Sequence, residues 1–178
     1  MCIRDSSLRD NQTFNKSLGQ HYLVSDDLIS RAIELAEVEE DDHVMEFGPG
    51  PGVLTEAILA SGCRLTAIEI DPLSIEHLRY AFAPEIESGQ LELIEGDALQ
   101  IEWPNDLTKV VANIPYQISS PLIELLTRYL RNPRTSELSK VVMLVQEEFA
   151  ERLVMEYESD VGSLGMTAAL DWICELED

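Results

Sequence analysis

Short apolar runs alternate along the chain with segments in which apolar residues recur at helical spacing. The runs are bounded by turn-forming residues, which is typical of buried strands. Strands are predicted at 43–47, 64–70, 91–95, 109–112, 140–145 and 171–176. Helices are predicted at 26–36, 53–59, 72–82, 122–130, 146–154 and 164–170. Strands that alternate with helices in this way indicate an α/β fold, with a mostly parallel sheet and helices on both of its faces.

The N-terminal segment differs in sequence pattern from the rest of the chain. Residues 1–13 show no periodicity, so we expect them to be disordered or foreign to the folded domain. Residues 14–178 are about the length of one domain. Within them, the polar segment 17–23 carries apolar anchors and is expected to lie as an ordered lid over the ligand-binding end of the sheet. A plain loop is the alternative for that segment.

The tetrapeptide Asn113-Ile114-Pro115-Tyr116 directly follows the predicted strand 109–112. Pro115 cannot extend the hydrogen-bonded ladder, so the strand is expected to end there. A serine cap followed by Pro121 in the first turn is expected to open the next helix. The tetrapeptide therefore lies at the carboxyl end of a strand, which is where open α/β sheets bind their ligands.

The side chains of this tetrapeptide suit methyl transfer to an exocyclic amine, whose lone pair is delocalised into its ring. The carboxamide of Asn113 and the carbonyl of Ile114 can accept the two amine hydrogens, with Pro115 fixing the backbone, and Tyr116 offers a ring for the base to stack on. Such catalysis works by orientation and preorganised dipoles. The alternative is an ordinary turn in which Tyr116 belongs to the core.

A glycine-rich turn, 48–52, joins the first strand to the next helix, which is the arrangement of a nucleotide-type site. Its glycines occupy every second position after Glu46, which suits a ligand with an amino-acid tail and no pyrophosphate. Glu69, near the end of the second strand, can accept the hydroxyls of a ribose. Asp97 follows the third strand and is placed to meet an adenine amino group. A structural turn at 48–52, a surface charge at Glu69 and a turn role for Asp97 are the alternatives.

The chain has 178 residues and a net charge of −22, with only 12 lysines and arginines. A solubility adaptation, such as one to high salt, explains this charge, and an acidic surface for a basic partner is the alternative. The charge counts against nucleic-acid binding, because phosphate contacts require Lys and Arg.

The three cysteines, Cys2, Cys63 and Cys174, lack the spacing of a metal site or a disulfide framework, so no metal is expected. No apolar run approaches membrane length, and residues 1–6 do not resemble a signal peptide. We therefore expect a cytoplasmic protein that does not associate with a membrane.

Taken together, the motifs resemble those of the ribosomal RNA adenine dimethyltransferase family, and they are more like its archaeal and eukaryotic branch than its bacterial one. The resemblance extends from about Asn15 to Cys174. It is carried by L-G-Q-H-Y-L at 18–23, E-F-G-P-G-P-G at 46–52, E-I-D at 69–71, G-D-A at 96–98, N-I-P-Y-Q-I-S-S-P at 113–121 and Q-E-E-F-A-E-R-L at 146–153. An acidic, lysine-poor archaeal protein would account for the charge.

The resemblance implies a Rossmann-like class I methyltransferase fold and S-adenosylmethionine as cofactor. It also implies dimethylation of two adjacent adenosines in small-subunit rRNA, within ribosome biogenesis. The substrate would be the rRNA or a precursor small subunit, and the protein a monomer. By the same resemblance, the cofactor contacts are His21 and Leu23 from the lid, Gly48 at the amino-acid part, Glu69 at the ribose, Asp97 at the adenine and Asn113. Tyr116 would stack on the flipped target adenine.

The sequence departs from the family pattern in two places. Residues 161–165 replace a run that usually supplies an aromatic residue and an arginine, so weaker RNA contact or local repacking is expected there. The chain also stops at Asp178, before the family's last strand, a loop whose Phe closes on the target base, and a C-terminal helical domain. We therefore expect a truncated chain that binds cofactor but does not catalyse.

Other functions remain open at this point. The second hypothesis is a ribosome-assembly factor that docks on a precursor small subunit, with methylation secondary or lost, although the intact motifs argue against complete loss. An adenine methyltransferase acting on DNA or another RNA is a further alternative, because the tetrapeptide is shared among enzymes that methylate amino groups.

Overall fold

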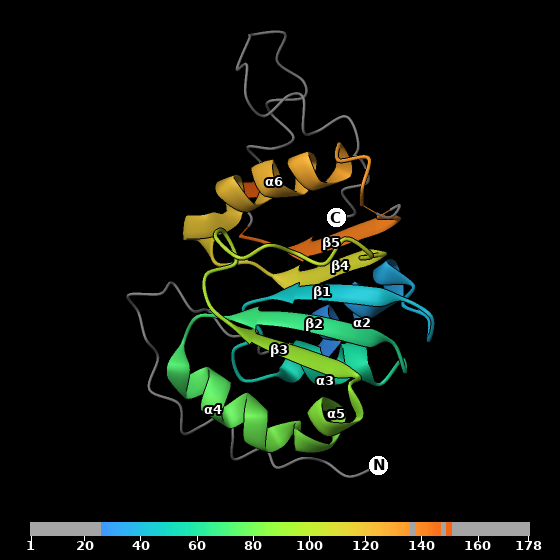
Figure 1. Cartoon of the computed structure of the whole chain (residues 1–178), viewed down its shortest axis with the longest axis vertical. Helices are drawn as coiled ribbons and strands as arrows, with labels where there is room; N and C mark the ends of the chain where they lie inside the picture. The colour runs from blue at the N-terminus through green and yellow to red at the C-terminus, as the bar shows by residue number, and fades with distance from the viewer. Residues whose placement is uncertain (1–25, 136–137, 147–148, 151–178) are drawn as a thin grey trace, which may run out of the picture.

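A computed structural model describes residues 26–135, 138–146 and 149–150. In these ranges five parallel strands form one sheet in the order β3-β2-β1-β4-β5 (Figure 1). The strands are β1 His43–Phe47, β2 Arg64–Glu69, β3 Leu91–Glu95, β4 Lys109–Asn113 and β5 Lys140–Leu144. The helices are α2 Asp26–Ala36, α3 Val53–Leu59, α4 Pro72–Ala81, α5 Ala83–Ser88 and α6 Tyr116–Leu130. The predicted parallel α/β architecture is thus confirmed.

The sheet separates two hydrophobic cores. Along β1 the side chain of Val44 belongs to one core, whereas Met45 and Phe47 belong to the other, because successive residues of a strand face opposite sides. The first core includes residues of α2, α3 and α4, and the second includes residues of α6 together with Trp103. Every residue of β1 is buried, as expected for the central strand of a parallel sheet.

The elements next to the carboxyl ends of the strands are fixed by local chemistry. Asp71 caps α4, its side chain accepting a hydrogen bond of 3.0 Å from the Ser74 amide, and Pro72 occupies the first helical turn. Gly52 precedes α3 with a φ of 84°. A Cβ at Gly52 would lie 2.5 Å from the ring of Phe82, so the turn before α3 requires glycine for its backbone and for its packing.

The start of α6 differs from the prediction. The serines and Pro121 at 119–121 were expected to open a helix over 122–130, but α6 begins at Tyr116 and carries Pro121 inside it. Pro115, with a φ of −60°, already has the backbone that leads into a helix, and its carbonyl accepts the Ile118 amide at 3.1 Å. Pro121 has no amide hydrogen to donate to the Gln117 carbonyl, so the helix lacks one backbone hydrogen bond there. Gln117 is exposed, so water can reach this residue. Tyr116 is therefore held on the first turn of a helix.

A few predicted features lie outside the described residues. They are the N-terminal segment 1–13, the lid at 17–23, most of the helix at 146–154, the helix at 164–170 and the strand at 171–176. α5 was not predicted. In the described part of the chain, no helix combines the length and the apolar character needed to cross a membrane.

Candidate functional site

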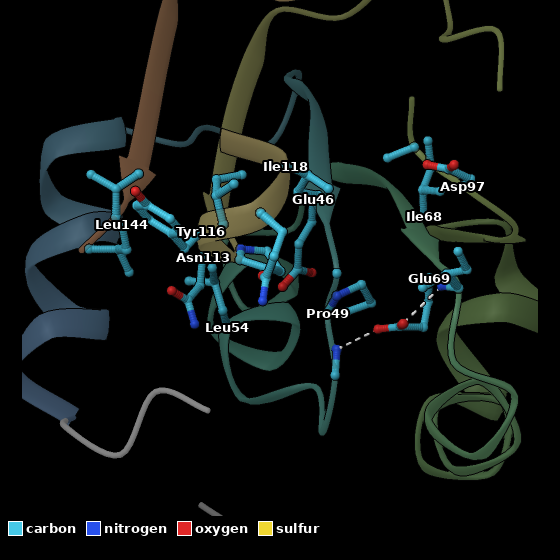
Figure 2. A pocket seen from close by; sticks show the side chains of 18 of the residues that line it. Glu46, Pro49, Leu54, Ile68, Glu69, Asp97, Asn113, Tyr116, Ile118 and Leu144 are labelled. Atoms are coloured by element: carbon cyan, nitrogen blue, oxygen red, sulfur yellow. Dashed lines mark hydrogen bonds between the residues drawn. The ribbon is translucent and has the colours of Figure 1, made fainter. Parts of the chain in front are cut away.

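A cavity of about 500 Å³ opens at the carboxyl ends of the strands. Its walls come from the glycine turn between β1 and α3, the ends of β2 and β3, the junction of β4 with α6, and the end of β5. Figure 2 shows Asn113 and Tyr116 at one side of this cavity, Glu69 and Asp97 at the other, and Pro49 and Glu46 between them. The volume is suitable for a nucleoside-sized ligand.

The glycine turn leaves room for a ligand against its backbone. Gly48 has a φ of 64°, and its amide donates to the Ile68 carbonyl at 2.9 Å, which ties the turn to β2. A Cβ at Gly48 would meet no atom of the described chain within 4 Å. The space beside Gly48 is therefore open, and a side chain there would both strain the backbone and enter the cavity.

Glu69 is almost completely buried, at 3% exposure, yet it lines the cavity. One carboxylate oxygen, Oε2, accepts the Gly50 amide at 2.9 Å. The other, Oε1, accepts the amides of Ile70 and Asp71, both at 2.8 Å. Because each oxygen has two lone pairs, Oε1 is filled and Oε2 has one site left. Glu69 thus clamps the glycine turn to the start of α4 and offers one remaining acceptor position to a hydroxyl.

Asp97 lies at the same end of the cavity, just after β3. Its carboxylate accepts the Leu99 amide at 2.9 Å and the side-chain amide of Gln100 at 2.7 Å. These contacts hold the carboxylate while leaving further lone pairs on both oxygens, so Asp97 can accept a hydrogen bond from a ligand amine.

Glu46 is a functional candidate to which the sequence assigned no role. It is the penultimate residue of β1, is 1% exposed, lines the cavity, and accepts a hydrogen bond from the hydroxyl of Thr55 at 2.7 Å. Burial raises the pKa of Glu46 to about 8, and the negative charge of Glu69 adds to the rise. A positively charged ligand in the cavity would favour the ionised form. The feature of the sequence that could have identified Glu46 is its position as an acidic residue inside an otherwise apolar strand.

The tetrapeptide forms the opposite wall of the cavity. Asn113 is the last residue of β4 and pairs with Leu144 of β5, and the Ile114 amide donates to the Leu144 carbonyl at 2.9 Å. Tyr116 is 44% exposed, and its ring meets that of buried Phe149 edge to face, with centroids 6.5 Å apart and planes at 87°. The wall thus combines a backbone fixed by β5 with an aromatic ring open to the cavity.

The predicted site residues in the described part of the chain all come together in this cavity. They are Gly48, Glu69, Asp97, Asn113, Ile114, Pro115 and Tyr116. His21 and Leu23 lie outside the described residues. The structure brings the set together, and the role of each side chain stays a prediction.

The polar groups of the cavity indicate what kind of ligand fits. Among the described lining residues there are three carboxylates, Glu46, Glu69 and Asp97, and there is no lysine, arginine or histidine. Such a site disfavours a phosphate and suits a ligand with positive charge, hydroxyls and an amine. S-adenosylmethionine has these groups: a sulfonium, an ammonium, a ribose diol and an adenine amine. The described residues contain no group of side chains that could hold a metal ion.

Comparisons of the sequence with known proteins agree on one family. The family model "Ribosomal RNA adenine dimethylase" matches residues 11–173. The probable ribosomal RNA small subunit methyltransferase A of Thermococcus kodakarensis is 45% identical over 141 residues, which are 79% of this chain and 46% of that protein. Its counterpart in Methanopyrus kandleri is 40% identical, over 79% of this chain and 47% of that protein. The chain spans about half the length of these curated relatives.

Solved structures show the same fold. The 23S rRNA methyltransferase ErmE matches with a TM-score of 0.64 at 28% identity, over 77% of this chain and 52% of that one. A dimethyladenosine transferase from Plasmodium falciparum matches with a TM-score of 0.62 at 32% identity, over 75% of this chain and 46% of that one. The described sheet therefore has the Rossmann-like class I methyltransferase fold that the resemblance implied.

Proposed function

The chain belongs to the ribosomal RNA adenine dimethylase family, and from that premise we propose that it serves S-adenosylmethionine-dependent dimethylation of adenosine in small-subunit rRNA. The methyl groups would go to the exocyclic amines of two adjacent adenosines, as a step of ribosome biogenesis in the cytoplasm. One observation carries the proposal: a single cavity joins an acceptor-rich end, at Glu69 and Asp97, to the Asn113–Tyr116 wall.

The acceptor-rich end would hold the cofactor. When bound, S-adenosylmethionine supplies a methyl group on a positively charged sulfur, which an amine nitrogen can attack. The open backbone at Gly48 would receive the amino-acid part, the free lone pair of Glu69 a ribose hydroxyl, and Asp97 the adenine amine. Glu46, buried between the two ends, would balance the positive charge.

The tetrapeptide would hold the target base. The Asn113 carboxamide oxygen and the Ile114 carbonyl would accept the two hydrogens of the target amine, which turns its lone pair toward the methyl group. The face of the Tyr116 ring would stack on the base. Because these groups orient the nitrogen and need not remove its proton beforehand, a strong base is unnecessary.

Recognition of the RNA would depend on the base in the cavity more than on phosphates. The net charge of −22 disfavours a broad set of phosphate contacts. The proposed partner is therefore the small-subunit rRNA or a precursor small subunit, in which other components can present the adenosine. We propose that the protein acts as a monomer.

Calorimetry with S-adenosylmethionine tests the cofactor end on the chain itself. We expect saturable binding at one site, weakened by Asp97→Ala and unchanged by Asp26→Ala, an exposed aspartate outside the cavity. A chain that is folded by circular dichroism and shows no heat of binding would contradict the cofactor assignment.

Transfer of tritiated methyl groups to small subunits, free rRNA and DNA tests the substrate. It is measured on a form of the protein extended to the length of its relatives, because the 178 residues alone are expected to bind cofactor without catalysis. We expect label on adenosine of small-subunit rRNA, as dimethyladenosine after nuclease digestion. Label on DNA or on other RNA would replace this substrate with another nucleic acid. Cofactor binding and subunit binding without any transfer would indicate an assembly factor instead.

A further inference from the structure

The ring of Tyr116 contacts a buried neighbour, Phe149, that is not part of the cavity lining. Tyr116 lines the cavity and is 44% exposed, so its own surroundings leave much of the ring uncovered. Phe149 is 4% exposed and is not among the lining residues. Its ring stands at 87° to that of Tyr116 with centroids 6.5 Å apart, a preferred geometry for aromatic pairs. A perpendicular neighbour leaves at least one face of the Tyr116 ring uncovered by Phe149.

Phe149 is buried, but it lies outside the two cores formed by the described residues. Phe149 belongs to neither of the hydrophobic clusters described above, although it is as buried as many of their members. Large buried aromatic side chains usually serve a core. The ring contact between Phe149 and Tyr116 places this buried ring beside the cavity wall.

The end of β5 explains how Phe149 reaches this position. The Gln146 carbonyl accepts the amides of Phe149 at 2.9 Å and of Ala150 at 3.1 Å, which makes a helical turn directly after the strand. Two residues before that turn, the Leu144 carbonyl accepts the Ile114 amide. One short segment therefore contacts the tetrapeptide twice, at the backbone of Ile114 and at the ring of Tyr116.

We propose that Phe149 is a positioning residue, which sets the orientation of the Tyr116 ring for stacking on the target adenine. The inference rests on the proposed function and adds a residue to it. Without Phe149, the Tyr116 side chain would have more freedom to rotate about its bonds. Binding of the base would then have to order the ring, and the entropy lost would weaken binding. Cofactor binding, at the other end of the cavity, would not depend on Phe149.

A double-mutant cycle on methyl transfer to small subunits, in the form of the protein extended to the length of its relatives, tests this role. We expect Phe149→Ala to lower kcat/KM for the subunit by roughly 3- to 10-fold, as for the loss of one aromatic pair, with S-adenosylmethionine affinity unchanged. In the Tyr116→Ala background the same change should have almost no further effect, because its target is gone. Phe149→Tyr should retain most of the activity. Equal losses in both backgrounds would overturn the inference.

A core variant provides the matched control. Leu107 is fully buried in the second core, which also contains Trp103, and lies outside the cavity lining. We expect Leu107→Ala to lower the melting temperature. Any effect of Leu107→Ala on kcat/KM should be the same with and without Tyr116→Ala. The same additivity for Phe149→Ala would mean that Phe149 supports only the fold, against the proposal.

The ring contact has a readout that does not require activity. In protein with ring-labelled tyrosine, the Tyr116 resonance is assigned by its loss in Tyr116→Phe. Phe149→Leu should move that resonance, since the ring current of Phe149 is removed. An unmoved resonance would overturn the inference alone. Absence of methyl transfer by the extended protein without substitutions would instead overturn the proposed function, and with it the role of this contact in stacking. The resonance would still report whether the rings meet.

Discussion

The two ends of the cavity are built differently. At the cofactor end, Glu69 is 3% exposed and accepts three backbone amides, so its position is fixed by hydrogen bonds before any ligand arrives. At the target end, Tyr116 is 44% exposed and has the edge contact with Phe149. A small cofactor can be met by a rigid site, whereas a base presented by a large RNA requires a wall that is open. The difference predicts distinct consequences for changes at the two ends.

The largest expected effect is on the transfer step at the target end. Asn113→Ala removes the carboxamide that would orient the amine, and we expect methyl transfer by the extended protein to fall by roughly 10²- to 10³-fold. S-adenosylmethionine affinity should fall by much less. Asn132→Ala, at an exposed asparagine after α6, is the matched control. A variant at Asn113 that transfers methyl as fast as the unchanged protein would remove Asn113 from the proposed mechanism.

At the cofactor end, Glu69→Gln should weaken S-adenosylmethionine binding by roughly 30- to 100-fold, equivalent to about 2–3 kcal/mol. The amide NH₂ of glutamine cannot accept the backbone amides that the carboxylate accepts, so a buried donor is left unpaired. Calorimetry measures the change. Glu95→Gln, at an exposed glutamate paired with Arg79, should bind like the unchanged protein. Equal affinities for the two variants would contradict the clamp role of Glu69.

The stacking role of Tyr116 is separable from that of its hydroxyl. Tyr116→Ala should lower kcat/KM for the RNA by roughly 5- to 100-fold, because base–aromatic stacking contributes about 1–3 kcal/mol. Tyr116→Phe keeps the ring and should change kcat/KM by less than about threefold. If Tyr116→Phe were as damaging as Tyr116→Ala, the hydroxyl and not the ring face would be the important group.

Glu46 is buried between the two ends of the cavity, and its raised pKa predicts that the stability of the fold depends on pH. Its pKa is about 8 in the folded chain against 4.5 for an ordinary glutamate, chiefly because of burial. Between these values the folded state holds a proton that the unfolded state has lost. The free energy of unfolding should therefore fall as the pH rises from about 4.5 to 8, and change no further above that.

Glu46→Gln should remove this fall, which denaturant unfolding at pH 5 and pH 8 measures. Because a cationic ligand favours the ionised carboxylate, S-adenosylmethionine affinity should rise with pH up to about 8, by at most about tenfold per pH unit. Calorimetry in buffers of different ionisation enthalpy should show proton release that Glu46→Gln abolishes. Equal pH dependence in both proteins would contradict the role of Glu46.

The framework of the fold could be predicted because the relevant signals are local in sequence. The apolar runs gave the bounds of β1 and β3 correctly, and the glycine turn at 48–52 lies where the pattern placed it. Gathering of the site residues in one cavity follows from topology, since the carboxyl ends of parallel strands meet at one edge of the sheet.

The remaining features depend on contacts between distant segments. The early start of α6 depends on Pro115, while the serine and proline at 120–121 suggested a later start. The three amides on Glu69 and the raised pKa of Glu46 come from burial and from turns that meet in space. The ring contact of Phe149 joins segments more than 30 residues apart, and no periodicity in the sequence indicates it.

A crystal structure of the protein with S-adenosylmethionine bound tests the central claim most directly. The account predicts the ligand in the cavity, with its amino-acid part over Gly48, its ribose beside Glu69 and its adenine at Asp97. It also predicts that the side chain of Asn113 faces the sulfur. A ligand bound elsewhere on the chain, or an Asn113 side chain turned away from the sulfur, would contradict it.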